Sequence, residues 1–239
     1  LSCLPQKTAL LKQLQADYCL MLPFTHELSC LSAQAFMKML HEQFNIQALL
    51  IGYDHRFGHN RSEGFNDYCR YGRELGMEIL QAQALVENGV SISSSVIRKL
   101  LKEGNVEQAN HFLGYSYYLD GTVVNGYKVG RTLGFPTANL KPSCPEKLIP
   151  EEGVYAVYVF LNEQRFAGML NIGHRPTLNN GTDLSIEVHI LDFNADIYNK
   201  SMRIEFVQRI RTEQKFTSLN ELIEQLRQDR QAVRKLLLD

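Results

Sequence analysis

The hydrophobic pattern of the chain changes near residue 114, and this change restricts the possible folds more than any other feature. Before that point, short apolar runs such as Gln47 to Gly52 alternate with helical segments such as Ser32 to Phe44, in which apolar residues recur every three to four positions. After it, the period shortens to two and strands dominate. We therefore predict two domains, residues 1–113 and 114–239.

The first domain is predicted to be an α/β fold with a parallel, Rossmann-like sheet, because helices and strands alternate along it. The expected helices are Lys7 to Leu14, Ser32 to Phe44, Glu63 to Leu75, and two that begin at Ser94 and Val106. The expected strands are Tyr18 to Leu22, Gln47 to Gly52 and Glu78 to Gln83.

The second domain is predicted to be a small antiparallel β-barrel with one C-terminal helix. Tyr155 to Leu161 is apolar on both faces, as in the wall of a barrel or sandwich. Further strands are expected at Gly168 to Ile172, Leu184 to Leu191 and Met202 to Val207. The closing helix begins at Ser218, where Glu221 completes a capping box.

Composition limits the classes of partner. The formal net charge is −1, so the chain lacks the basic excess expected of a nucleic-acid-binding protein. No apolar run approaches the roughly 18 residues of a membrane span. The five cysteines contain no C-x-x-C pair, which indicates reduced thiols in a cytoplasmic protein. A small anionic substrate is the expected partner, and the oligomeric state stays open.

The segment Gly121 to Leu140 is equipped to hold a polyphosphate. Its glycines can adopt positive φ and let main-chain N–H groups approach an anion, and two cations supply charge beside it. These residues are Gly126, Gly130, Gly134, Lys128 and Arg131. The alternative is a β-hairpin with a glycine-rich turn and a solvated basic edge.

Thr137 and Asn139 follow in the same segment and are candidate ligands of a magnesium ion. A hydroxyl and an amide oxygen both suit this hard cation, and Pro136 fixes the backbone before them. Two residues apart on an extended segment, they face the same side. The alternative is that Thr137 only ends a strand.

Glu187 is the candidate catalytic group. In the run from Leu184 to Ile190, Glu187 and His189 share one face and the apolar residues share the other. Both polar side chains therefore point either into a cleft or into solvent.

Several motifs in order resemble those of riboflavin kinases. They are Gly-Arg-Thr-Leu-Gly-Phe-Pro-Thr-Ala-Asn at 130–139, Gly153 to Val157, Asn171 to Thr177, Glu187 to His189, Leu191 to Phe193 and Arg211 to Phe216. The resemblance implies the barrel fold of that family and a kinase that converts riboflavin and ATP to FMN and ADP. It further implies Mg²⁺ with ATP at Thr137 and Asn139, and Glu187 as the base for the ribityl hydroxyl.

The segment Arg211 to Phe216 resembles the family's cover over the flavin and nucleotide, which makes Arg211 and Glu213 candidate flavin-binding residues. These two residues could equally form a surface ion pair. Asn171 and Arg175 could simply shape a turn, so we leave them out of the catalytic set.

Two segments of the first domain resemble the FMN adenylyltransferase module of bacterial bifunctional riboflavin kinase/FAD synthetases. The loop Ile51 to Gly58 and the helix start Ser93 to Arg98 stand where α/β sheets and helix N-termini bind phosphates. The candidate residues are Asp54, Arg56, Ser94, Ser95 and Arg98. Plain helix capping is the alternative for Ser94 and Ser95, and Tyr53, His55 and Ser95 depart mildly from the family pattern.

The family's adenylyltransferases also carry a Gly-x-Phe-Asp-Gly-x-His-x-Gly-His segment, and no His-x-Gly-His precedes residue 32 in this sequence. Without those histidines we expect weak FAD synthesis from this polypeptide, the adenylyl step belonging to a longer parent protein. The rival functions are a flavin- or nucleotide-binding regulator without catalysis, and a cytidylyltransferase-like enzyme, which would leave the β half unexplained.

Overall fold

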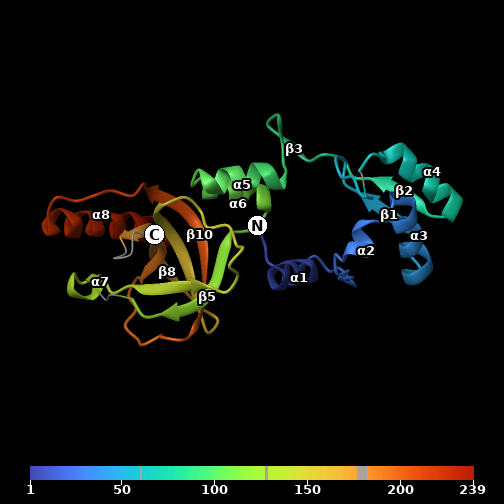
Figure 1. Cartoon of the computed structure of the whole chain (residues 1–239). Coiled ribbons are helices and arrows are strands. Elements are labelled where there is room, and N and C mark those ends of the chain that lie inside the picture. Colours follow the sequence, from blue (N-terminus) through green and yellow to red (C-terminus); the bar gives the residue numbers. More distant parts are fainter. Residues whose placement is uncertain (60, 127–128, 177–181) are drawn as a thin grey trace. The chain divides into compact units, whose positions relative to one another are not determined.

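The computed structural model describes residues 1–59, 61–126, 129–176 and 182–239. They form two compact units (Figure 1). One unit is Leu11–Ile92, and the other joins Leu1–Leu10 to Ser93–Asp239.

The unit Leu11–Ile92 is a small α/β body. Strand β1 (Ala48–Ile51) pairs in parallel with β2 (Glu78–Gln81). Helices α3 (Ala33–Phe44) and α4 (Phe65–Leu75) contribute to one apolar core with β1. The remaining elements are α2 (His26–Ser29), β3 (Val86–Glu87) and β4 (Val90–Ser91). The parallel pairing agrees with the predicted Rossmann-like organisation.

The strand predicted at Tyr18 to Leu22 is wrong. These residues form no strand, and Tyr18 is 95% exposed and Leu20 51% exposed. A strand needs a neighbour that satisfies its backbone N–H and C=O groups. In the described part of this unit, β1 pairs only with β2, so the apolar run has no ladder to join. Apolar residues alone did not specify a strand.

The second unit contains a closed antiparallel barrel, which confirms the predicted architecture (Figure 1). Its strands are β5 (Tyr118–Val124), β6 (Ala138–Pro142), β7 (Gly153–Leu161), β8 (Gln164–Pro176), β9 (Thr182–Ile190) and β10 (Ser201–Arg211). Around the barrel they follow the order β10, β5, β6, β9, β8, β7. Strand β9 therefore lies between β6 and β8, although β6 is far from it in sequence.

The C-terminal helix α8 (Leu219–Leu237) covers the outer face of β7 and β8. Ser218 begins it, as predicted, by accepting a hydrogen bond from the Glu221 backbone N–H. Val233 of the helix packs with Ala156 and Met169. The neighbouring positions on these strands, such as Val157 and Leu170, are fully buried and alternate to the other face. Both faces of the sheet are therefore covered in this region.

Further helices belong to the same unit. They are α5 (Ser94–Lys102), α6 (Val106–Leu113), α7 (Val129–Thr132) and the first part of α1 (Leu4–Gln13). Asn110 of α6 donates to the Phe206 carbonyl of β10 at 2.8 Å. The helix pair before residue 114 thus packs with the barrel in one compact unit, and the functional division at residue 114 stays a prediction.

Gly121 sits where β5 approaches β6 most tightly. A Cβ atom added there would lie 2.3 Å from the backbone oxygen of Lys141. We expect Gly121→Ala to lower the free energy of unfolding by about 1–3 kcal/mol, since the two backbones must separate. Urea denaturation measures the loss. Gly52→Ala is the control, because its added Cβ meets only the Cβ of His55 at the ordinary contact distance of 3.4 Å, and an equal effect of both substitutions would contradict this account.

Candidate active site

Three neighbouring strands bring polar side chains into one row. Glu187 of β9 is the register partner of Asn139 on β6 and of Asn171 on β8. Directly opposed residues of antiparallel strands project from the same face. His189 shares that face and opposes Met169, which packs under α8, so the row lies on the outer side of the barrel wall. Asn171, left out of the predicted catalytic set, is thus a direct neighbour of Glu187.

Thr137 and Glu187 are in contact. The Thr137 hydroxyl donates a hydrogen bond of 3.1 Å to Oε2 of Glu187. Both side chains are partly buried, so water competes for this bond less than it would at the surface. The candidate metal ligand and the candidate base therefore belong to one site.

His189 fixes the segment that carries Thr137. Its Nδ1 lies 2.9 Å from the Pro136 carbonyl oxygen, so Nδ1–H donates to that oxygen. Its ring also meets Phe135 edge to face. Burial lowers the pKa of His189, and the Pro136 hydrogen bond only partly opposes this shift, so the ring is neutral near pH 7. These contacts give His189 a structural role beside Glu187.

The glycines of the loop are needed for space rather than for unusual φ. A Cβ at Gly126 would lie 2.2 Å from Nδ2 of Asn139, and one at Gly130 would lie 2.3 Å from the Phe135 oxygen. Gly126, Gly130 and Gly134 could all adopt positive φ, but only Gly134 does so, at +80°. Lys128 lies outside the described residues. The loop backbone packs directly against the side chain of Asn139.

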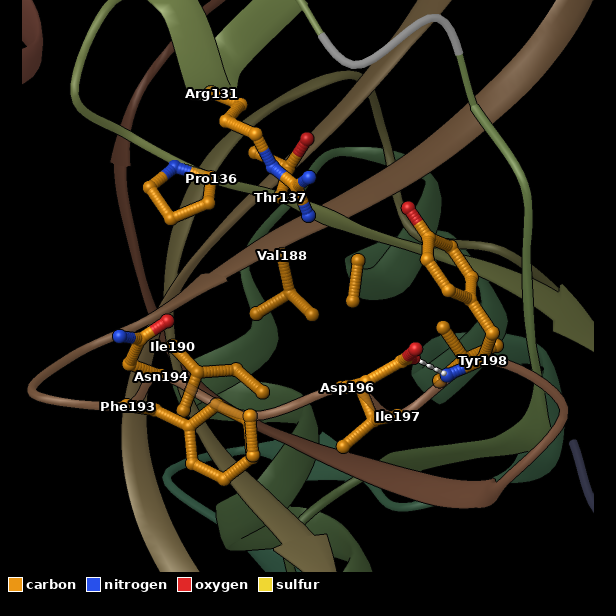
Figure 2. A pocket seen from close by; sticks show the side chains of 13 residues that line it. Arg131, Pro136, Thr137, Val188, Ile190, Phe193, Asn194, Asp196, Ile197 and Tyr198 are labelled. Carbon is orange, nitrogen blue, oxygen red and sulfur yellow. Dashed lines mark hydrogen bonds between the residues drawn. The ribbon is translucent and has the colours of Figure 1, made fainter.

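A pocket of about 630 Å³ opens beside Thr137. Figure 2 shows Arg131, Pro136 and Thr137 along one side and Val188 near the middle, and Ile190 also lines the pocket. The segment after β9 closes the other side through Phe193, Asn194, Ala195, Asp196, Ile197 and Tyr198. A volume of this size, lined by both apolar side chains and polar groups, suits a small organic ligand.

The residues that follow Phe193 in this wall were missed from the sequence. The motif Leu191 to Phe193 ends just before them, and residues 194–198 form no regular helix or strand. The Tyr198 backbone N–H donates to the Asp196 carboxylate at 3.0 Å, which folds the segment on itself. An Asp side chain that accepts from the backbone N–H two residues later forms an Asx-type turn. Asp196 was therefore the local sequence signal for this folded segment.

Glu213 reaches the same row from the segment after β10. Its carboxylate forms a hydrogen bond with Asn171 and lies close to Gly173. Although the residue as a whole is exposed, loss of water around the carboxyl group raises its pKa, with Glu152 adding to the rise and Arg211 and Asn171 opposing it. Glu213 and Glu187 thus flank Asn171 from two sides.

Arg211 is held by α8. Its guanidinium Nε lies 3.0 Å and its Nη2 2.9 Å from Oδ2 of Asp229, which is 2% exposed. Gln225 also donates to this carboxylate. The ion pair therefore differs from the predicted alternative, a surface pair with Glu213. The predicted contact of Arg211 with flavin stays a prediction.

In the other unit, Asp54 and Arg56 lie exposed on the loop after β1. Phe57 anchors this loop: its ring stacks on Tyr68 with centroids 4.2 Å apart, and its backbone N–H donates to the Tyr68 hydroxyl. Gly58 has φ of +94°, and a Cβ there would meet the Ala33 backbone. Phe57 and Gly58 therefore fix one end of the loop, and Asp54 and Arg56 lie exposed just before that end.

Ser94, Ser95 and Arg98 lie exposed on α5. Ser93, not Ser94 or Ser95, caps this helix, because its side chain accepts from the Val96 N–H. The capping alternative for Ser94 and Ser95 is therefore wrong. Their hydroxyls stand beside the first N–H groups of the helix, an arrangement that suits a phosphate.

The described residues contain no group of three or more His, Cys, Asp or Glu side chains arranged to hold a metal ion. A cation at this site would therefore depend on the hydroxyl and amide oxygens of Thr137 and Asn139, which fit Mg²⁺ by donor type. Of the helices in the described parts of the chain, none is both long and apolar enough to cross a membrane.

Comparison with known proteins gives the same assignment for both parts of the chain. A family model described as riboflavin kinase matches residues 113–237, and one described as FAD synthetase matches residues 1–96. The bifunctional riboflavin kinase/FMN adenylyltransferase of Escherichia coli (strain K12) is 37% identical over 237 residues, 98% of this chain and 75% of that protein. The protein of the same description from Listeria monocytogenes serovar 1/2a is 37% identical over 98% of this chain and 74% of that protein.

A solved structure from Streptococcus pneumoniae, described as a macrolide-efflux protein, shares this fold. The TM-score is 0.89 at 31% identity, over 97% of this chain and 74% of that one. The likeness therefore extends through both units.

The Arg211–Asp229 pair provides a stability test. Arg211→Leu leaves a buried carboxylate without its partner, so we expect the free energy of unfolding to fall by about 3–5 kcal/mol. The double variant Arg211→Leu/Asp229→Leu should recover part of that loss. Urea denaturation is the measurement. Arg227→Leu, which removes an exposed partner of Glu224 on the same helix, should cost under about 1 kcal/mol; equal costs would show that the Asp229 contact does not anchor α8.

Proposed function

The chain belongs to the family of bifunctional riboflavin kinase/FMN adenylyltransferases, and we propose that the site around Thr137 and Glu187 performs its riboflavin kinase reaction. The enzyme acts in flavin cofactor biosynthesis, and its barrel domain is a riboflavin kinase domain. The reaction at the site is the transfer of the terminal phosphoryl group of ATP to the ribityl hydroxyl of riboflavin, giving FMN and ADP.

The observation that carries this proposal is the hydrogen bond of 3.1 Å from Thr137 to Glu187. This hydrogen bond connects the proposed phosphate-binding segment to the partly buried carboxylate of Glu187. A carboxylate has several lone pairs, so Glu187 can accept from Thr137 and from an alcohol together. Phosphoryl transfer depends mainly on alignment, and Glu187 orients the hydroxyl and takes its proton.

The pocket beside Thr137 is the proposed place for the nucleotide. Its apolar walls, which include Val188, Ile197 and Tyr198, suit a purine ring. Arg131 stands at the rim where the phosphates would leave the pocket (Figure 2). We assign phosphate contacts to Gly126, Gly130, Arg131 and Lys128, whose own position lies outside the described residues.

Thr137 and Asn139 are the proposed protein ligands of magnesium. When bound with ATP, the cation would neutralise charge on the phosphates. Asn139 is 7% exposed and confined by Gly126, so its amide has little freedom to turn away. The oxygens of the pair then face the side where Glu187 stands.

The flavin is proposed to lie along the outer face, near Asn171 and Glu213. Asn171 adjoins Glu187, Glu213 forms a hydrogen bond with Asn171, and both side chains offer groups for the hydroxyls of a ribityl chain. Arg211 is anchored to α8 by its ion pair with Asp229. We propose that it also contacts the flavin.

We propose that the first module, residues 1–113, transfers an adenylyl group to FMN. The kinase domain is then residues 114–239. Asp54 and Arg56 would contact flavin, and Ser94, Ser95 and Arg98 would contact the phosphates of ATP. The proposed partners are thus riboflavin, FMN and ATP, and the dependence on ATP supports a cytoplasmic location.

Glu187→Gln tests the base assignment. The substitution keeps the shape and removes the proton acceptor, so we expect kcat for FMN formation to fall about 10²–10⁴-fold while riboflavin affinity stays nearly constant. ADP release and flavin titration give the two quantities. The exposed Glu146→Gln is the control. An unchanged kcat in Glu187→Gln would remove Glu187 from this role, and flavin binding by the wild type without turnover would favour the regulatory module.

Thr137→Ala tests the metal and nucleotide site. Loss of the hydroxyl should raise the magnesium and ATP concentrations needed for half-maximal rate by about tenfold, roughly the worth of one well-placed charge-assisted contact. Thr137→Ser keeps the hydroxyl and should retain near-normal requirements. Initial rates over a magnesium titration check this, and a normal metal dependence in Thr137→Ala would exclude Thr137 from the site.

A further inference from the structure

Residues 1–10 are attached to the barrel by a buried polar contact. Gln6, 5% exposed, accepts a hydrogen bond of 2.8 Å from the Lys147 ammonium and donates one of 2.8 Å to the Asp120 carboxylate. The Lys147 ammonium also stands 4.3 Å from the centre of the Tyr117 ring. We name Gln6, Lys147 and Asp120 the N-terminal clamp.

The N-terminal clamp brings two cysteines together from distant parts of the sequence. The Cys3 backbone N–H lies 3.4 Å from Oε1 of Gln6, the atom that also accepts from Lys147. Cys144 starts the turn that carries Lys147, closed by a hydrogen bond of 3.1 Å from the Lys147 N–H to the Cys144 carbonyl. Both cysteines are therefore attached to the same clamp.

Cys144 is also one of the groups that act on the Cys3 thiol. Burial raises the pKa of Cys3, a hydrogen bond with the Cys144 thiol raises it further, and the Lys147 ammonium opposes the rise. Cys3 and Cys144 are free and only partly buried, so a small molecule can reach them. A disulfide requires the two sulfurs to approach to bonding distance, and attachment of both cysteines to the same clamp favours that approach.

We propose that Cys3 and Cys144 form a reversible disulfide by exchange with a low-molecular-weight disulfide, which locks the N-terminal segment onto the barrel. The thiolate of one cysteine attacks a sulfur of the small disulfide and expels one thiolate, leaving a mixed disulfide. The second cysteine, as thiolate, then attacks the protein sulfur and expels the other half. Two protein thiols are oxidised, one small disulfide is reduced to two thiols, and two protons pass to the leaving groups.

The other cysteines have no comparable arrangement. Cys19 and Cys30 are exposed, and the Cys30 sulfur lies 3.7 Å from Nε2 of His26. Cys69 is partly buried on α4 in the other compact unit. These three give the matched controls. A cross-link between residues 3 and 144 would close a long loop and so restrict the unfolded chain strongly.

Peptide mapping of the whole chain tests the proposal. The protein is incubated with oxidised glutathione in slightly alkaline buffer, which supplies thiolate, and free thiols are then alkylated before digestion without reductant. We expect a linked Cys3–Cys144 peptide pair, about 2 Da lighter than the two thiol peptides together, that separates on reduction. Oxidation should also raise the thermal unfolding midpoint.

Three variants make the result specific. Cys144→Ser should abolish the linked pair and the rise in unfolding midpoint, whereas Cys69→Ser should change neither. Gln6→Leu keeps both cysteines but breaks the N-terminal clamp, so the rate of linkage should fall several-fold. Absence of the linked pair in the wild type, equal pairing of Cys3 with Cys19 or Cys30, or an unchanged rate in Gln6→Leu would each overturn the proposal.

Discussion

The register of β9 between β6 and β8 is the constraint on which the site depends. It places Asn139, Glu187 and Asn171 side by side on one face. A slip of one residue would turn Glu187 to the buried side and expose Val188, which is now fully buried. Burial of an unpaired carboxylate and exposure of apolar side chains both oppose that slip. The packing of the barrel therefore also fixes the geometry of the chemistry.

The same strand separates two environments. Val188 and Ile190 line the pocket, while Glu187 and His189 project from the opposite face. Thr137 belongs to both, because it borders the pocket and donates to Glu187. In the proposed kinase reaction, Thr137 would therefore stand between the nucleotide in the pocket and the alcohol beside Glu187. This residue directly precedes β6.

Local patterns predicted much of this fold and part of the site. Alternation in β9 predicted that Glu187 shares a face with His189, and Ser32 and Ser218 correctly marked helix starts. What failed depended on contacts between distant residues. Tyr18 to Leu22 has the composition of a strand but no partner, and the glycine loop needed knowledge of Asn139 to show that space, rather than φ, requires Gly126.

Asn171 shows the same limit from the opposite side. Its sequence context suggested only a turn. Asn171 lies beside Glu187 because β8 pairs with β9, and it meets Glu213 because the segment after β10 returns to the same row. No local sequence pattern predicts these contacts, because β8, β9 and the segment after β10 come together only when the barrel closes. The irregular wall at residues 194–198 is similar, since only the folded chain brings it to line the pocket beside Thr137.

The predicted domain boundary at residue 114 differs from the boundary of the compact units at residue 93. Helices α5 and α6 show why. Short amphipathic helices must bury their apolar side, and α6 does so against β10, with Asn110 bridging the Phe206 carbonyl and the Tyr117 N–H. Arg209 of β10 reinforces the contact by donating to the Glu103 carbonyl at the end of α5. The barrel therefore carries the helix on which Ser94 and Ser95 stand. If those serines hold phosphate for adenylyl transfer, the kinase barrel is part of the scaffold of the second reaction.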